Sequence, residues 1–285
     1  MPSLREIRRR IASTKDIQKI TKAMQTVAGV RLRRAQSRLF AARPYAKKMD
    51  EMMKHLASQT ADENHPLMKS REVHKSALIV ITADRGFCGG FNSNVVRGAL
   101  GRVVEEGKPD LGLICIGRKG SDTLNRERVE IISKYTNIFQ ALEYGQASEI
   151  ADHVIDLFTN GGIDQVDLLY NEFKSAGQQN LVTEQLLPVP PMLIDSDPGF
   201  TGYQYEPSQQ LLLNELVPQH IRFQIWRVLL ESNTAEEAAR MLAMDNATRN
   251  ANDLIDELTL TANKIRQETI TSELMDIVGG AEALK

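Results

Sequence analysis

The sequence predicts an α/β protein in which long N- and C-terminal helices form an antiparallel coiled coil around an inserted Rossmann-like α/β domain. Three observations carry this prediction. Apolar residues recur at three- and four-residue steps through both ends of the chain, strands alternate with helices in the middle, and the two ends carry opposite charge. We expect a helix over residues 1–57, an α/β domain over 75–195, and a helix over 208–285 that pairs with the first.

The composition of the 285 residues, 42% hydrophobic but only 5% aromatic, favours helices packed through Leu, Ile, Met and Ala. No apolar run is long enough to span a bilayer. The two cysteines, Cys88 and Cys115, are too few for a disulfide framework, which favours a reducing compartment.

The first helix is expected to begin at Ser3, because Ser3 and Glu6 have capping-box spacing. Pro44 is its only strong breaker and predicts a kink or a local end. The apolar seam starts at Leu4, Ile7 and Ile11, slips by one position, and later returns to its first phase. The slipped part is Ile17, Ile20, Met24 and Val27, and the returning part is Leu32, Ala35, Leu39, Ala42, Ala46, Met49, Met53 and Leu56.

The charge of this segment is strongly positive. Residues 1–48 hold fourteen Lys or Arg and two acids, a net charge of +12, whereas residues 231–285 hold eleven acids and five bases, a net charge of −6. A basic helix is compatible with a solvated face, with nucleic-acid binding or with a transit peptide. The matching acidic helix at the other end favours a structural pair over a cleaved leader.

The middle of the chain predicts a mainly parallel sheet. After a polar linker at 60–75 come strands at 77–82, 111–116, 129–132, 166–170 and 181–187, with helices to about residue 106 and over 137–158.

The Gly-rich loop from Asp84 to Asn92 lies between a strand and a helix, where phosphates bind in many α/β folds, but its glycines suit tight turns equally well. The segment from Gly112 to Lys119 has P-loop spacing, but Arg118 replaces the required Lys. The five histidines lack metal-ligand spacing, and no nucleophile motif is present. We therefore expect no catalytic residue, no cofactor and no metal, which points to a scaffolding or mechanical protein.

The C-terminal helix has the clearest seam. It runs through Met241, Met244, Thr248, Ala251, Ile255, Leu258, Ala262 and Ile265 at alternating three- and four-residue steps. The next apolar residue, Ile270, follows only after five positions, and Leu274, Ile277, Ala281 and Leu284 continue from it. This jump rotates the apolar face, so the end of the helix is expected to meet something other than its first partner.

Three stretches together resemble the γ subunits of F-type ATP synthases. They are residues 11–24 (IASTKDIQKITKAM), residues 82–92 (TADRGFCGGFN) and residues 239–281, which begin ARMLAMDNAT and end ITSELMDIVGGA. The redox-regulated plant members carry an insert with a cysteine pair, which this sequence lacks, so it resembles the bacterial type.

The resemblance implies a non-catalytic rotor shaft that couples rotation of the membrane c ring to conformational changes in the β subunits. It implies α, β and ε subunits and the c ring as partners, no nucleic acid, and a peripheral position on the cytoplasmic face of the plasma membrane. The family's contact positions match two sets of residues here, Met24, Arg266, Gln267 and Thr271 toward β, and Tyr203, Tyr205 and Glu206 toward ε and the c ring. The seam beyond the jump is expected to enter the family's apolar collar through Ile270, Leu274, Ile277 and Leu284. Two rival functions remain at this point, an α/β enzyme using the loop 84–92 and a basic nucleic-acid adaptor.

Overall fold

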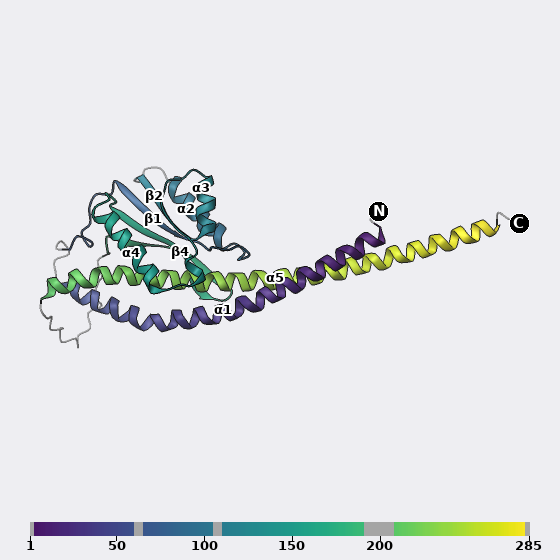
Figure 1. Ribbon diagram of the computed structural model, residues 1–285, viewed down its shortest axis with the longest axis horizontal. Coiled ribbons are helices and arrows are strands. Elements are labelled where there is room, and N and C mark those ends of the chain that lie inside the picture. Colours follow the sequence, from purple (N-terminus) through teal and green to yellow (C-terminus); the bar gives the residue numbers. More distant parts are fainter. Residues whose placement is uncertain (1–2, 60–64, 105–109, 191–207, 283–285) are drawn as a thin grey trace. The chain divides into compact units, whose positions relative to one another are not determined.

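The computed structural model describes residues 3–59, 65–104, 110–190 and 208–282 (Figure 1). The elements follow one another as α1 (Leu4–Gln59), β1 (Lys75–Ile81), α2 (Phe91–Val104), β2 (Asp110–Ile116), α3 (Arg118–Arg126), β3 (Ile131–Tyr135), η2 (Ile138–Gln140), α4 (Tyr144–Thr159), β4 (Gln165–Ser175), β5 (Gln178–Leu187) and α5 (Gln209–Glu282). Contacts group the chain into two compact units, Met1–Gly29 with Arg240–Lys285, and Val30–Ala239. Both long helices contribute to both units, and the domain boundaries expected from helix ends stay a prediction.

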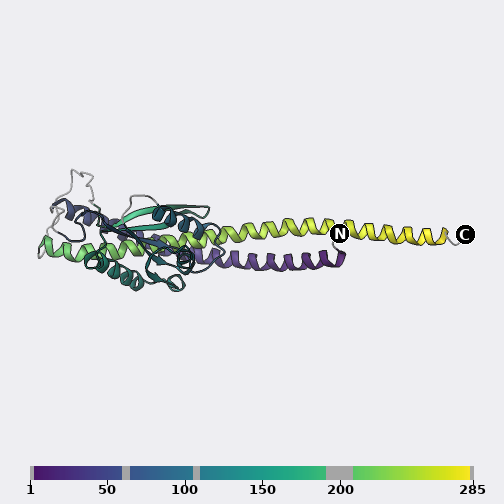
Figure 2. The same cartoon turned by 90° about the horizontal axis from the view of Figure 1, so that it is seen from above.

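In the first unit the two long helices lie side by side and run antiparallel (Figures 1 and 2). Three polar pairs join them: Gln18 with Asn252, Thr21 with Thr248, and Gln25 with Asp245. As the residue number rises along α1 it falls by the same amount along α5, which is the register of an antiparallel pair. The predicted antiparallel helix pair is confirmed.

The α5 seam lies where its spacing predicted. Met244, Thr248 and Ala251 are buried, and the exposed Leu254 and Leu260 fall between seam positions. The remaining positions are half-buried against α1: Met241, Ile255, Leu258, Ala262 and Ile265. The heptad spacing therefore identified the packed face of this helix from sequence alone.

The α1 seam differs from the prediction, because the expected slip does not occur. Ile17, Ile20 and Val27 are exposed to 52%, 59% and 52%. The seam instead continues without a break through polar residues, namely Thr14, Gln18, Thr21 and Gln25, before Ala28 and Leu32. These polar side chains tolerate burial because three of them hydrogen-bond across to α5. The seam of this part of α1 is therefore formed by hydrogen-bonded polar residues and not by the apolar residues beside them.

In the second unit the strands form one sheet in the order β3-β2-β1-β4-β5. The first four strands pair in parallel and β5 pairs antiparallel to β4. Residues Ala77–Ile81 of β1 are at most 1% exposed, as expected of a strand covered on both faces. The mainly parallel sheet is confirmed, although β3 begins at Ile131 and not at residue 129.

Helices cover both faces of this sheet. α2 and α3 pack on one face, where Val95, Ala99 and Leu124 join the core, and α4 lies on the other face with the part of α5 before Arg240 (Figure 1). Helix α3, which buries only three residues, was not predicted from the sequence. The start of the helix expected over 137–158 is wrong: Asn137 has a left-handed backbone, and α4 begins at Tyr144 after a Glu143 capping box.

Candidate functional site

The tip of α5 carries an apolar stripe for which α1 supplies no partner. The pairing register matches the first residue of α1, Leu4, with Arg266 of α5. Every described side chain from Arg266 to Val278 is exposed. Ile270, Leu274 and Ile277 recur on one face there, exposed to 48%, 57% and 68%. Large apolar side chains gathered on one helix face mark an interaction surface, so this tip stripe is the first candidate contact of the chain.

A second apolar stripe lies on α1. Ile17, Ile20 and Val27 point away from the seam into solvent, and Met24 is half-buried among them. The expected slip of the seam placed these residues in the coiled-coil contact, so this exposed surface was not predicted. The signal that could have revealed it is the unbroken heptad phase from Ile7 and Ile11 through Thr14 to Ala28.

The structure brings together only some of the residues expected to contact β. Arg266, Gln267 and Thr271 share one exposed stretch of α5, where the Thr271 hydroxyl donates to the Gln267 carbonyl at 2.9 Å. Met24 lies beside the Gln25–Asp245 pair, which is about 30 Å from Arg266 along the helix axis. These residues therefore form two separate patches.

The expected foot residues and the last collar residue cannot be compared with the structure. Tyr203, Tyr205, Glu206 and Leu284 lie outside the described residues. Of the described part of the chain, no group of His, Cys, Asp and Glu is arranged to hold a metal ion. Nor does any helix there have the length and apolar character needed to cross a bilayer.

The Gly-rich loop leads to a helix end whose first amides are already paired. At the start of α3, the Arg118 N–H donates to the Asp84 carboxylate at 3.1 Å, the Lys119 N–H to a carbonyl at 3.0 Å, and the Gly120 N–H to Thr82 Oγ1 at 2.9 Å. Asp84 is buried and also accepts an N–H from Asn137 at 2.8 Å. The chain's own carboxylate thus occupies the position in which a helix N-terminus would bind a phosphate.

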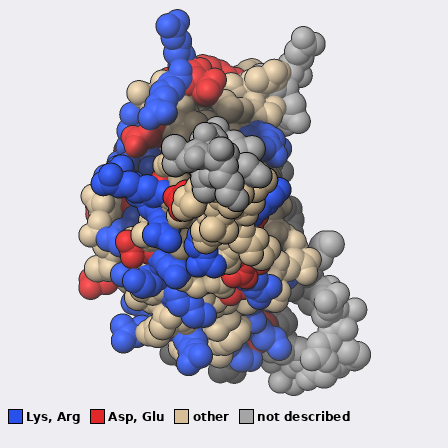
Figure 3. Space-filling model, turned by 90° about the vertical axis from the view of Figure 1, so that its right-hand side faces the viewer, with Lys and Arg blue, Asp and Glu red and all other residues tan. Residues whose placement is uncertain are grey.

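Basic side chains cover much of the outer surface of α1. Lys and Arg outnumber Asp and Glu on the face drawn in Figure 3. In the second unit, Arg31 and Arg43 approach Glu237 and Glu231 of α5 at 3.7 and 3.8 Å. The remaining positive charge favours acidic partner surfaces through long-range attraction.

A buried histidine near the start of α5 is held neutral. His220 is 4% exposed, and burial lowers its pKa to about 4, with the Arg227 charge adding to the effect. The charged groups around it come from three elements: Asp50 of α1, Glu184 of β5 and Arg227 of α5. Its Nδ1 lies 3.8 Å from Asp50 Oδ1, too far for a hydrogen bond.

His220 should make the stability of the second unit depend on pH. The neutral form is favoured in the folded chain, so its contribution is complete above the unfolded pKa of about 6.5 and declines as the pH falls toward 4. We expect wild type to lose about 2 kcal/mol more than His220→Gln between about pH 7.5 and about pH 5, measured by urea denaturation. Equal losses in both chains would contradict a neutral buried imidazole.

Comparison with known proteins defines the family. The family model for ATP synthase matches residues 3–284. An ATP synthase gamma chain of Chlorobaculum tepidum is 45% identical over 291 residues, and one of Heliobacterium modesticaldum is 43% identical over 291 residues, each covering 100% of both chains. A chain solved in the central stalk and c ring of the Tetrahymena thermophila mitochondrial ATP synthase is 29% identical with a TM-score of 0.61, covering 80% of this chain and 99% of that one. A chain of the Euglena gracilis mitochondrial ATP synthase shares the fold at a TM-score of 0.70 and 20% identity, covering 99% and 94%.

The paired helices, the inserted sheet and the family match define the class: the chain is a subunit of an ATP synthase. Because its relatives match along their whole length, the chain belongs to the ATP synthase γ-chain family. The prediction of a central rotor shaft is confirmed.

Proposed function

We propose that this chain is the non-catalytic shaft of a proton-translocating ATP synthase and lies on the cytoplasmic face of the plasma membrane. The tip of its helix pair turns inside a ring of α and β subunits. Its other end meets the ε subunit and the c ring. Rotation presents an asymmetric surface to each β subunit in turn and biases its conformation through differential contacts.

The observation that carries this proposal is the tip stripe. Ile270, Leu274 and Ile277 are apolar, exposed and beyond the reach of α1. Apolar contact is non-directional, so such a surface can meet several equivalent partners at different angles without breaking specific bonds. That property suits a helix end that rotates within a collar.

The proposed contacts are those expected from the sequence. Those toward β are Met24, Arg266, Gln267 and Thr271; those in the collar are Ile270, Leu274, Ile277 and Leu284; and those toward ε and the c ring are Tyr203, Tyr205 and Glu206. The exposure of Ile17, Ile20 and Val27 beside Met24 supports an apolar contact on α1 as well.

The hydrogen bonds at the start of α3 support a non-catalytic role. A nucleotide phosphate placed there would displace the buried Asp84 carboxylate from two backbone N–H groups or be repelled by it. The catalytic nucleotide sites are accordingly assigned to the partner subunits. Calorimetric titration of the isolated chain with ATP should give no binding heat.

The collar contact can be tested with charges on the tip stripe. The double variant Leu274→Asp and Ile277→Asp should weaken assembly with α and β subunits at least tenfold, because it places two charges in an apolar contact. The far-ultraviolet circular dichroism of the isolated chain should stay nearly unchanged, since both side chains are exposed before assembly. Assembly is measured by co-purification and by ATP hydrolysis of the reconstituted complex.

A matched control places the same charges on the opposite side of the helix. Ser272→Asp and Met275→Asp lie about 165° and about 130° around α5 from the middle of the tip stripe, and both side chains are exposed. This control should assemble within about threefold of wild type, given the modest effects of surface substitutions. Equal assembly of the two double variants would show that the tip stripe is not a bearing surface.

A further inference from the structure

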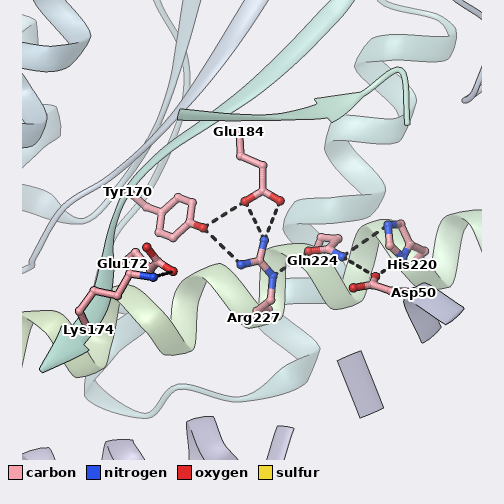
Figure 4. Close-up of polar contacts among 8 residues, drawn as sticks. All are labelled: Asp50, Tyr170, Glu172, Lys174, Glu184, His220, Gln224 and Arg227. Atoms are coloured by element: carbon pink, nitrogen blue, oxygen red, sulfur yellow. Dashed lines mark hydrogen bonds and ion pairs between the residues drawn. The ribbon is translucent and has the colours of Figure 1, made fainter. Parts of the chain in front are cut away.

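A cluster of hydrogen bonds and ion pairs joins the shaft helix α5 to the sheet in the second unit (Figure 4). At its centre, Arg227 of α5 donates to both carboxylate oxygens of Glu184 on β5, at 2.9 and 2.8 Å. The same guanidinium donates to the Tyr170 hydroxyl on β4 at 3.2 Å, and that hydroxyl donates to Glu184 at 3.0 Å. We call Tyr170, Glu184 and Arg227 the junction triad.

The junction triad is extended on both sides along α5. One turn earlier, Gln224 accepts from Arg227 Nε at 2.7 Å and donates to Asp50 of α1 at 3.3 Å. One turn later, Glu231 accepts the backbone N–H of Phe173 on β4 at 3.1 Å. Three successive turns of α5 are thus fixed to neighbouring elements by directional bonds, and Figure 4 shows the first two of them.

The charge states of the triad make these bonds strong. Burial raises the pKa of Tyr170 to about 12, so its phenol keeps the proton that it donates. Burial alone would lower the pKa of Arg227, but Tyr170 and Glu184 together raise it, so the guanidinium remains charged. Nη2 of Arg227 contacts both carboxylate oxygens, while Nη1 and Nε donate to Tyr170 and Gln224, so three partners together fix the plane of the guanidinium.

The stability of the fold does not explain why polar groups lie at this position, because apolar packing would stabilise the junction equally well. The Arg227 and Glu184 side chains are 23% and 40% exposed, so the pair is partly buried. Even a fully buried ion pair can often be replaced by apolar residues of similar volume with a neutral or stabilising effect. Apolar packing is not directional. Its stabilising free energy decreases only slowly as two elements slide or rotate, whereas a hydrogen bond weakens steeply as its angle departs from linearity. The junction triad therefore contributes resistance to twist at the point where the sheet meets the helix.

We propose that the junction triad is a torque coupling, which prevents the α/β domain from twisting about α5 when the chain turns under load. Tyr170, Glu184 and Arg227 are then positioning residues for energy transmission, acting through the rigidity of α5. This inference rests on the proposed function as a rotor shaft. At this site, a substitution can change the coupling between ATP hydrolysis and ion transport without changing the folding stability of the chain.

The test removes the directional hydrogen bonds of the junction triad and keeps apolar packing in their place. In the triple variant Tyr170→Phe, Glu184→Leu and Arg227→Met, all charges of the triad are lost together, so none remains unpaired. The variant is assembled into the whole ATP synthase in membrane vesicles. We expect ATP hydrolysis within twofold of wild type and at least a threefold loss in ions transported per ATP hydrolysed.

A control removes the same chemistry without touching the junction. Glu172 and Lys174 form a 2.9 Å ion pair whose two partners both belong to β4, so Glu172→Leu with Lys174→Met deletes an ion pair of the sheet and leaves the bonds of the triad in place (Figure 4). This control should transport ions at the wild-type ratio. A triple variant that also does so would overturn the torque coupling. A wild-type complex whose hydrolysis and transport do not require this chain would instead overturn the proposed function.

A second variant decides the matter if the triple variant does not fold. Arg227→Lys keeps the charge but replaces the planar fork by a single ammonium group. We expect an intermediate loss of transport per ATP, at least 1.5-fold, and a wider angular fluctuation of a bead attached to the α/β domain of a surface-held complex. Wild-type values for both quantities would refute the coupling role.

Discussion

Replacing Gly117 with alanine should lower the free energy of unfolding of the second unit by at least about 3 kcal/mol, or prevent its folding. Gly117 joins β2 to α3 with a backbone φ of +95°, a region that side chains disfavour. A Cβ there would lie 2.0 Å from the Thr82 carbonyl oxygen, inside van der Waals contact. The backbone cannot retreat easily, because the Gly117 N–H donates to Tyr135 at 2.8 Å.

The matched control for this prediction is Gly101→Ala in α2. Nothing lies within 4 Å of the position its Cβ would take. Alanine favours helix over glycine, so this change should raise the free energy of unfolding by about 0.5–1 kcal/mol. Urea denaturation followed by circular dichroism measures both, and similar effects of the two substitutions would contradict the steric argument.

Replacing Met244 with aspartate should separate the two helices of the first unit. Met244 is 6% exposed within the α5 seam, and an ionised carboxylate placed there would be removed from water without a partner. We expect this to cost at least about 3 kcal/mol, enough to abolish pairing of this unit. Hydrogen exchange should then show residues 4–29 unprotected, while strands β1 and β2 keep their protection.

The same substitution at Leu260 provides the comparison. Leu260 lies on the same helix but is 72% exposed, so Leu260→Asp should leave exchange in the first unit nearly unchanged. Loss of protection in both variants would indicate that helix propensity, and not seam burial, holds the pair. Protection retained with Asp at position 244 would place the seam elsewhere.

Local patterns predicted much of this fold because they arise from neighbouring residues. The alternating steps from Met241 to Ile265 identified the packed face of α5, and the apolar run beginning at Ala77 identified the central strand of the sheet. Helix and strand periods are properties of the backbone, so an apolar repeat at either period reveals the element that it would bury. The jump from Ile265 to Ile270 likewise located the point at which α5 loses its partner.

Polar positions were predicted poorly because their environment depends on residues far along the chain. Thr21 lies in the seam since Thr248 faces it, although hydrophobicity favours its exposed neighbour Ile20 for the buried position. Asn137 interrupts an expected helix because its N–H and that of Phe139 bond to Asp84, more than fifty residues earlier. In each case a hydrogen-bond partner far along the chain determined the burial or the backbone conformation of the residue.

The sequence by itself determined the two long helices, the mainly parallel sheet and the unpartnered apolar tip, because each depends on the order of side chains along one element. Only the tertiary structure decided which face of α1 meets α5, and that Arg227, Glu184 and Tyr170 converge on one point. The physical reason is the difference between apolar burial and hydrogen bonding. Burial of apolar surface is non-directional and follows from periodicity, whereas a hydrogen bond requires two specific groups at one distance and angle.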